Sequence, residues 1–145
     1  SEMLILERRD SPHPLAVGSP VGRRIQLPPG GALGKALLSG LSAEQAETVV
    51  QQLDLVPTTA RTIVEPEALL REIARARELG YASEQGEYYD GVSGVGVPAI
   101  FDANRPLAAL GIVGPSSRLA DEIASLGKLL REVTATLRPA VPPPR

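Results

Sequence analysis

The sequence contains no cysteine, no tryptophan and a single histidine, His13, among its 145 residues. Without cysteine the chain cannot hold a disulfide, an iron–sulfur cluster, a thiolate zinc site or a cysteine nucleophile. Aromatic residues make up only 3% of the chain, which leaves few rings for stacking single-stranded nucleic acid. No apolar run approaches the roughly 20 residues of a membrane span, and no signal peptide is visible. We therefore expect a cytoplasmic protein that does not bind a membrane.

The charge balance bears on nucleic-acid binding. Fifteen lysines and arginines face 17 aspartates and glutamates, a net charge of −2, which counts against DNA or RNA binding by this chain itself. Apolar residues make up 43% of the sequence, enough for one domain with a substantial core.

Hydrophobic patterning predicts a mixture of strands and helices. Short strands are expected over residues 3–7, 15–19 and 24–27, and later strands over 81–85, 92–101 and 107–113. The last two strands join through a tight turn at 102–105, so the sheet is at least partly antiparallel and the fold class is α+β.

Four helices are expected. The first ends at Ser39 before Gly40, and the second begins at Ser42, which forms a capping box with Gln45. The third runs from Pro66 to Gly80. The last is a long amphipathic helix whose apolar stripe repeats at spacings of four and three: Leu119, Ile123, Leu126, Leu130, Val133 and Leu137.

The most informative segment is residues 27–38, where two prolines and two glycines lead abruptly into a helix. Free backbone N–H groups at a helix start favour an anion such as a carboxylate or a phosphate. A nucleotide-binding P-loop is excluded, because Pro29 stands where that pattern needs glycine and Ala36 where it needs a hydroxyl. The alternative interpretation is an ordinary tight turn into a packed helix.

The strands at 92–101 and 107–113 carry a second signal. Side chains alternate between the two faces of a strand, so Gly94 and Gly96 share one face while Val95 and Val97 share the other. Gly111 continues the small-residue pattern on the return strand. Glycine inside a strand indicates a close approach to the backbone, either by a packed helix or by a small molecule in a cavity.

Polar candidates for chemistry are few. Glu84, Glu87 and Asp90 lie close together in the sequence and would serve either as acid–base groups or as solvated surface charges. His13 has no apparent partner to orient it, and no ligand cluster supports a metal site. We expect neither a cofactor nor a metal.

Taken together, several segments resemble the effector-binding domain of IclR-family bacterial transcription regulators. The resemblance runs to about Arg138 and is carried by segments that match in order and spacing: residues 11–15, 21–24, 32–38, 66–70, 77–82, 87–92 and 114–119. It implies a GAF-like domain over residues 1–138, with a mostly antiparallel sheet flanked by helices. Residues 139–145 are then a proline-rich tail, which we expect to be disordered.

The resemblance also implies partners. A small metabolite, often a carboxylic acid, would bind on one side of the sheet, and the protein would form homodimers or tetramers. DNA would be bound only through an N-terminal winged helix-turn-helix domain that is absent from this chain.

The family's pocket positions can be carried over residue by residue. Ala32 and Leu33, with Gly31 before them, resemble the place where backbone amides meet the ligand's carboxylate, and Glu84 resembles an acidic pocket position. Three polar positions have become apolar here: Gly94 replaces a frequent cysteine, and Gly111 and Val113 replace small hydroxyl residues. A histidine at the start of the loop has become Pro29. These changes predict a roomier, more apolar pocket for an aromatic or longer acyl acid instead of a small keto-acid.

The leading hypothesis is therefore a ligand-sensing module without chemistry of its own. Two alternatives remain open at this point. One is a small GAF-like enzyme that uses Glu84 or Glu87 as an acid–base group, and the other is a ligand-free oligomerisation domain.

Overall fold

A computed structural model describes residues 2–27, 31–102 and 105–137 of the chain, and for residues 100–102 and 105–107 it describes the backbone alone. In chain order the elements are β1 (Glu2–Leu4), β2 (Arg24–Gln26), α1 (Ala32–Ser39), α2 (Ala43–Val50), α3 (Pro66–Leu79), β3 (Ala82–Gln85), β4 (Val92–Asp102), β5 (Arg105–Pro115), α4 (Ser116–Leu119), the 3-10 turn η1 (Ala120–Glu122) and α5 (Ile123–Thr136). The expected α+β class is confirmed.

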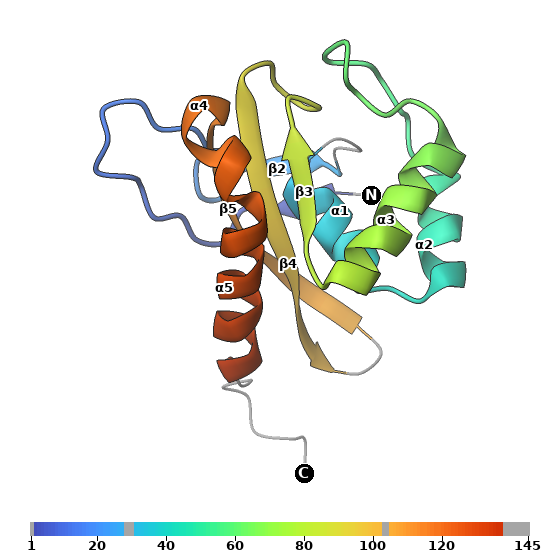
Figure 1. Cartoon of the computed structure of the whole chain (residues 1–145). Coiled ribbons are helices and arrows are strands. Elements are labelled where there is room, and N and C mark those ends of the chain that lie inside the picture. The colour runs from blue at the N-terminus through green and yellow to red at the C-terminus, as the bar shows by residue number, and fades with distance from the viewer. Residues whose placement is uncertain (1, 28–30, 103–104, 138–145) are drawn as a thin grey trace.

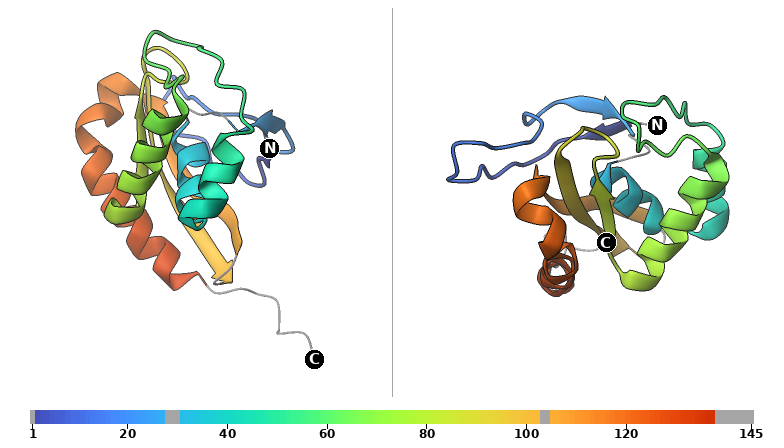
Figure 2. Two further views of the ribbon diagram at one scale, coloured as in Figure 1. Left: turned by 90° about the vertical axis from the view of Figure 1, so that its right-hand side faces the viewer. Right: turned by 45° about the horizontal axis from the view of Figure 1, so that its top comes forward.

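The strands of this part of the chain form two antiparallel sheets. β1 pairs with β2 in a short ribbon, and β3, β4 and β5 form a sheet in that order. The second sheet lies between two helical layers, with α5 on one face and α1, α2 and α3 on the other (Figures 1 and 2). The domain is therefore a three-layer sandwich in which α1 is the helix directly against the β4–β5 hairpin.

The small-residue pattern of the hairpin decides which helix lies on which face. A Cβ atom at Gly96 would lie 2.9 Å from the backbone oxygen of Ala32, so the backbone of α1 contacts the backbone of β4 here. On the opposite face, Val95 and Val97 pack in one cluster with Ile123 and Leu130 of α5. Alternation along the strand thus gives one face to close helix packing and the other to a bulky apolar core.

Local sequence signals set the bounds of the helices. The capping box is present, because the Ser42 side chain accepts from the Gln45 backbone N–H while the Gln45 side chain accepts from the Ser42 backbone N–H. Pro66 occupies the first turn of α3, and Gly80 ends that helix in the left-handed conformation, with φ of 78°. These predicted helix ends are confirmed.

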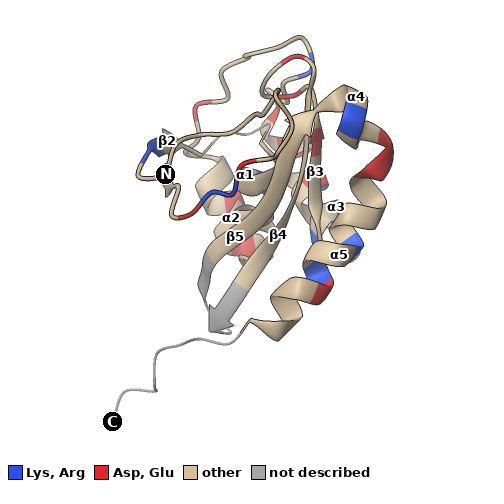
Figure 3. Cartoon of the chain, turned by 90° about the vertical axis from the view of Figure 1, so that its left-hand side faces the viewer, with Lys and Arg blue, Asp and Glu red and all other residues tan. Residues whose placement is uncertain are grey.

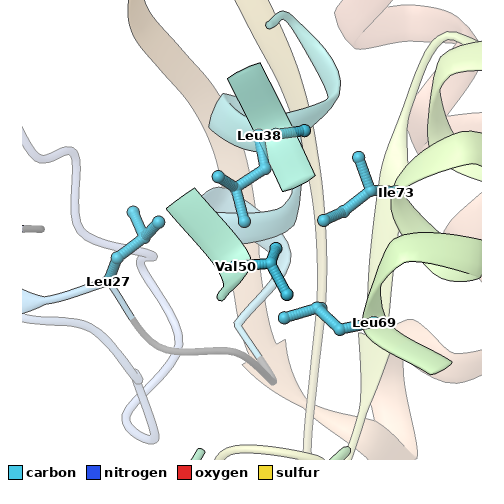
Figure 4. Close-up of a cluster of buried hydrophobic side chains, with 6 residues drawn as sticks. Leu27, Leu38, Val50, Leu69 and Ile73 are labelled. Carbon is cyan, nitrogen blue, oxygen red and sulfur yellow. The ribbon is translucent and has the colours of Figure 1, made fainter. Parts of the chain in front are cut away.

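A hydrophobic core joins α1, α2 and α3. Figure 4 shows Leu38 of α1 and Val50 of α2 pointing toward the α3 side chains, with Leu27 at the edge of the group. Leu69 and Ile73 supply the α3 side and are essentially inaccessible to solvent. The three helices therefore form one layer, in which α2 and α3 cover α1 on the side away from the sheet (Figure 2).

Two sequence-based expectations were wrong in detail. Residues 15–19 do not form a strand: Leu15 is 65% exposed, and its carbonyl accepts a hydrogen bond from the Arg118 guanidinium. A strand needs a partner for its backbone groups, and Pro14 and Pro20 on either side supply no backbone N–H for a ladder.

The last helix is also interrupted. Residues 116–136 form α4, the 3-10 turn η1 and α5, because the chain tightens at Ala120–Glu122 before the α-helix continues. The predicted apolar stripe is buried at Ile123 and Leu130, whereas Val133 and Leu137 are exposed. Along α4 and α5, basic and acidic positions are interspersed, as Figure 3 shows.

Residues 28–30 of the proline-glycine motif, residues 103–104 of the hairpin turn and the 138–145 tail lie outside the described residues. No helix in the part of the chain that the structure describes is both long enough and apolar enough to span a membrane.

The packing of α5 on the sheet yields a stability test. A Cβ at Gly127 would lie 2.6 Å from two ring atoms of Tyr81, so Gly127→Ala overpacks this contact. We expect a loss of about 1–3 kcal/mol in the free energy of unfolding, although alanine is the better helix former by about 1 kcal/mol. Urea unfolding measures this loss of stability, and Lys128→Ala, at an exposed position of the same helix, is the control. A stabilised Gly127→Ala variant would contradict this packing.

Candidate functional site

The structure brings the seven predicted ligand-binding residues together. In the sheet, Glu84 of β3 pairs with Gly94 of β4, which pairs with Val113 of β5. The next cross-strand row on the same face of the sheet is Ala82, Gly96 and Gly111. The N-terminus of α1 lies over these rows, since Ala32 contacts the position of Gly96. Residues from four separate segments thus form one site at the start of α1.

The beginning of α1 covers this site closely. Gly31 is the N-cap in an extended conformation, and no side chain caps the helix there. Ala32 is 1% exposed, and the Leu33 side chain fills the space above Gly111, where a Cβ would lie 2.6 Å from Leu33 Cδ2. In this conformation, helix packing therefore accounts for Gly96 and Gly111, which is the first of the two interpretations of the small-residue face.

Glu84 is the unusual member of the site. Its side chain is 4% exposed, and its Oε2 atom has no hydrogen-bond partner among the described residues. Burial raises the pKa of Glu84 from 4.5 to about 7, and the neighbouring Glu87 adds to this rise. The Lys35 ammonium and the backbone N–H groups of Ala32 and Tyr88 act in the opposite direction on the pKa. Near neutral pH this carboxyl therefore exists in both protonation states.

A buried lysine completes the electrostatics of the site, and sequence reasoning did not assign it. Lys35 of α1 is 1% exposed, and its Nζ lies 2.7 Å from Oε2 of Glu87. The signal was present in the sequence: α1 reads Ala-Leu-Gly-Lys-Ala-Leu-Leu-Ser and has no polar face on which a lysine could reach water. A lysine in such a helix must be buried with a counter-charge.

The turn that carries Glu87 is held by threonine hydroxyls. Thr59 donates to the Gly86 carbonyl at 2.7 Å, Thr62 to the Glu87 carbonyl at 2.8 Å and Thr58 to the Tyr88 carbonyl at 2.9 Å. The irregular segment between α2 and α3 is thereby attached to the turn between β3 and β4, beside the start of α1. These hydroxyls satisfy backbone groups of the turn that no strand partner serves.

An open groove of about 470 Å³ lies next to this turn. It is lined by residues of the 61–63 segment, of α3 and of the β3 end: Arg61, Ile63, Ala68, Arg71, Glu72, Gln85 and Glu87. The predicted site residues do not line it, but Glu87 belongs both to the groove and to the ion pair with Lys35.

The chemistry available at the site is binding. The site presents a buried ammonium, a carboxyl that is partly protonated near neutral pH, and helix N-terminal amides, which together suit an anionic ligand with a hydrogen-bonding group. Within the described residues, no group of three or more His, Asp or Glu side chains is placed to hold a metal ion.

Residues 1–138 match the family model described as the bacterial transcriptional regulator IclR C-terminal domain. The chain is 36% identical over 124 residues to the HTH-type transcriptional repressor AllR of Escherichia coli K12, covering 85% of this chain and 45% of AllR. The chain thus spans about half the length of the curated relatives it matches.

Two solved structures of other proteins share the fold of this chain. The IclR protein of Thermotoga maritima superposes with a TM-score of 0.82 at 24% identity, over 92% of this chain and 54% of that one. The inducer-binding domain of the Acinetobacter transcription factor PobR, in a double-mutant form bound to 3-hydroxybenzoic acid, gives 0.73 at 26% identity, over 93% and 75%.

The fold and the family match therefore define the effector-binding domain of a transcriptional regulator, and its relatives are regulators rather than enzymes. The chain belongs to the IclR family of bacterial transcriptional regulators and corresponds to the C-terminal domain of its members.

The raised pKa of Glu84 generates a test of the site's electrostatics. Between about pH 4.5 and 7 the folded protein keeps a proton on Glu84 that the unfolded chain has released, so its free energy of unfolding falls as the pH rises. Glu84→Gln mimics the protonated form and does not titrate. We expect the stability of this variant relative to wild type to increase by about 3 kcal/mol from pH 4 to pH 8.

Urea unfolding of both proteins at the two pH values measures this difference. Glu78→Gln removes an exposed carboxyl of α3 and is the matched control. A stability difference between Glu84→Gln and wild type that does not change with pH would mean that Glu84 ionises normally in the folded protein.

Proposed function

We propose that this chain senses a small organic carboxylate with an aromatic or longer acyl body. The observation that supports the proposal most strongly is the convergence of the α1 N-terminus, the buried Lys35 and Glu84 on the small-residue rows of the sheet. The helix N-terminus and the ammonium favour the ligand's carboxylate, while Gly94, Gly111 and Val113 offer no hydrogen-bonding side chain to a small polar keto-acid.

The ligand site would comprise Gly31, Ala32, Leu33, Glu84, Gly94, Gly111 and Val113. Leu33 fills the space over Gly111 in the present conformation, so its side chain must rotate or α1 must shift when a ligand enters. The PobR inducer-binding domain, 26% identical to this chain, was solved with a hydroxybenzoic acid, and a ligand of that class suits an apolar site with one cationic anchor for its carboxylate.

We further propose that the effector-binding domain covers residues 1–138. The full-length protein would be a cytoplasmic regulator in which an N-terminal winged helix-turn-helix domain, absent from this chain, binds DNA. The name of AllR as an HTH-type repressor, and the coverage of only 45% of its length, support this organisation. The ligand would act by favouring one of two arrangements of paired domains.

Isothermal titration tests the ligand class. We expect 3-hydroxybenzoate to bind measurably, whereas glyoxylate and pyruvate bind at least about tenfold more weakly, because the site lacks the donors that a keto-acid needs. Tight binding of glyoxylate or pyruvate without binding of aromatic acids would contradict the proposed ligand class.

We also propose that the chain forms a homodimer or a tetramer, as closed symmetric assemblies are the usual oligomers of soluble proteins. Exposed apolar side chains at Leu129, Val133 and Leu137 of the α5 region are compatible with self-association. Light scattering of the purified chain, whose mass is 15.2 kDa, should give twice or four times that mass. A chain that remains a monomer at its highest soluble concentration would contradict this.

A further inference from the structure

The ion pair between Lys35 and Glu87 joins two parts of the molecule that differ in burial. Lys35 lies in the middle of α1, and its neighbour Ala36 has no exposed surface. Glu87 lies in the turn between β3 and β4, and its side chain retains 18% of its exposure. The ammonium therefore belongs to the core, whereas its counter-charge reaches it from the surface.

A buried ammonium needs an anion, but that anion need not be Glu87. Removing the partner of a buried charge is strongly destabilising, whereas replacing it with another carboxylate at the same distance keeps the charge compensated. Moving the Glu87 carboxylate from the ion pair into water would cost little free energy, because its side chain is already partly exposed and lines the open groove. Exchanging one carboxylate for another at Lys35 therefore changes the free energy of the protein little.

Within the described part of the chain, Glu84 leaves a polar atom without a partner in the surroundings of Lys35. Its side chain is 4% exposed, and its Oε2 is buried without a hydrogen-bond partner among the described residues. The charged and titratable groups that act on Glu84 are Lys35 and Glu87. A ligand beside Lys35 that carries a hydroxyl would satisfy this oxygen, as a second point of attachment.

Release of Glu87 would also affect the segments that contact its turn. The backbone carbonyls of Gly86, Glu87 and Tyr88 are held by hydroxyls of the 58–62 segment, through one exposed and two part-buried hydrogen bonds. A turn held by a few hydrogen bonds opens more easily than a packed strand. Movement of Glu87 would therefore move the turn and the 58–62 segment together, away from α1.

We propose that Lys35 is the anchor for the carboxylate of the effector and that Glu87 occupies this anchor in the free protein, so that an acidic ligand binds by displacing Glu87 and releasing the β3–β4 turn. This inference rests on the proposed function, since it requires that an organic acid binds. It adds a residue, Lys35, and a route by which binding at the buried site changes the surface near residues 58–62.

Titration with 3-hydroxybenzoate tests the displacement. Glu87→Gln removes the competing charge, so we expect this variant to bind the acid roughly tenfold more tightly than wild type does. The double variant Lys35→Met/Glu87→Gln replaces the buried pair with neutral groups, which proteins tolerate well, and should fold but bind more than roughly tenfold more weakly. Glu72→Gln removes another carboxylate of the same groove and should leave the affinity unchanged.

Hydrogen exchange gives the structural measurement. The N–H groups of Gly86 and Val92 are bonded across the turn, to Val92 and Tyr89. Saturating 3-hydroxybenzoate should accelerate their exchange in wild type, although ligands ordinarily slow the exchange of a protein. Unchanged or slowed exchange would overturn the displacement.

The outcomes separate the two proposals. If wild type binds the acid but Glu87→Gln binds it equally or less tightly, the displacement is wrong and the proposed function stands. If neither wild type nor Glu87→Gln binds any aromatic or acyl acid, the proposed function fails, and the displacement fails with it.

Discussion

The close contact between α1 and the sheet is the constraint on which the rest of the structure depends. Gly96 and Gly111 let the backbone of α1 and the Leu33 side chain approach strands β4 and β5 to distances that no larger residue would allow. Because α1 is also covered by α2 and α3, it has no solvent-facing side on which a charge could lie. The depth of this packing is what buries Lys35 and brings the Ala32 amide to the Glu84 carboxyl.

That burial sets the electrostatic balance of the site. One ammonium faces two carboxyl groups: Lys35 pairs with Glu87, while burial, with a smaller contribution from Glu87, raises the pKa of Glu84 to about 7. In the proposed displacement, the carboxylate of a ligand would change both the protonation of Glu84 and the partner of Lys35. This response is the property that a sensing domain of a transcriptional regulator needs, and it involves no covalent step.

Local rules predicted most of the fold. The Ser42 capping box, Pro66 at the start of α3 and Gly80 at its end are short-range signals, and period-two alternation placed Gly94 and Gly96 on one face. The predicted strand at 15–19 failed because a strand depends on a distant partner, which the sequence does not reveal. Lys35 was missed for a related reason, because its role depends on Glu87, which lies 52 residues away. The apolar residues around Lys35 in the sequence did indicate that this lysine would be buried.

The most direct test is a crystal structure of this chain with 3-hydroxybenzoate. We predict that the ligand's carboxylate lies within hydrogen-bond distance of Lys35 Nζ, near the backbone amides at the start of α1, and that Glu87 has left the ammonium. A ligand bound instead in the open groove beside Arg61 and Arg71, with the pair between Lys35 and Glu87 still at 2.7 Å, would contradict it.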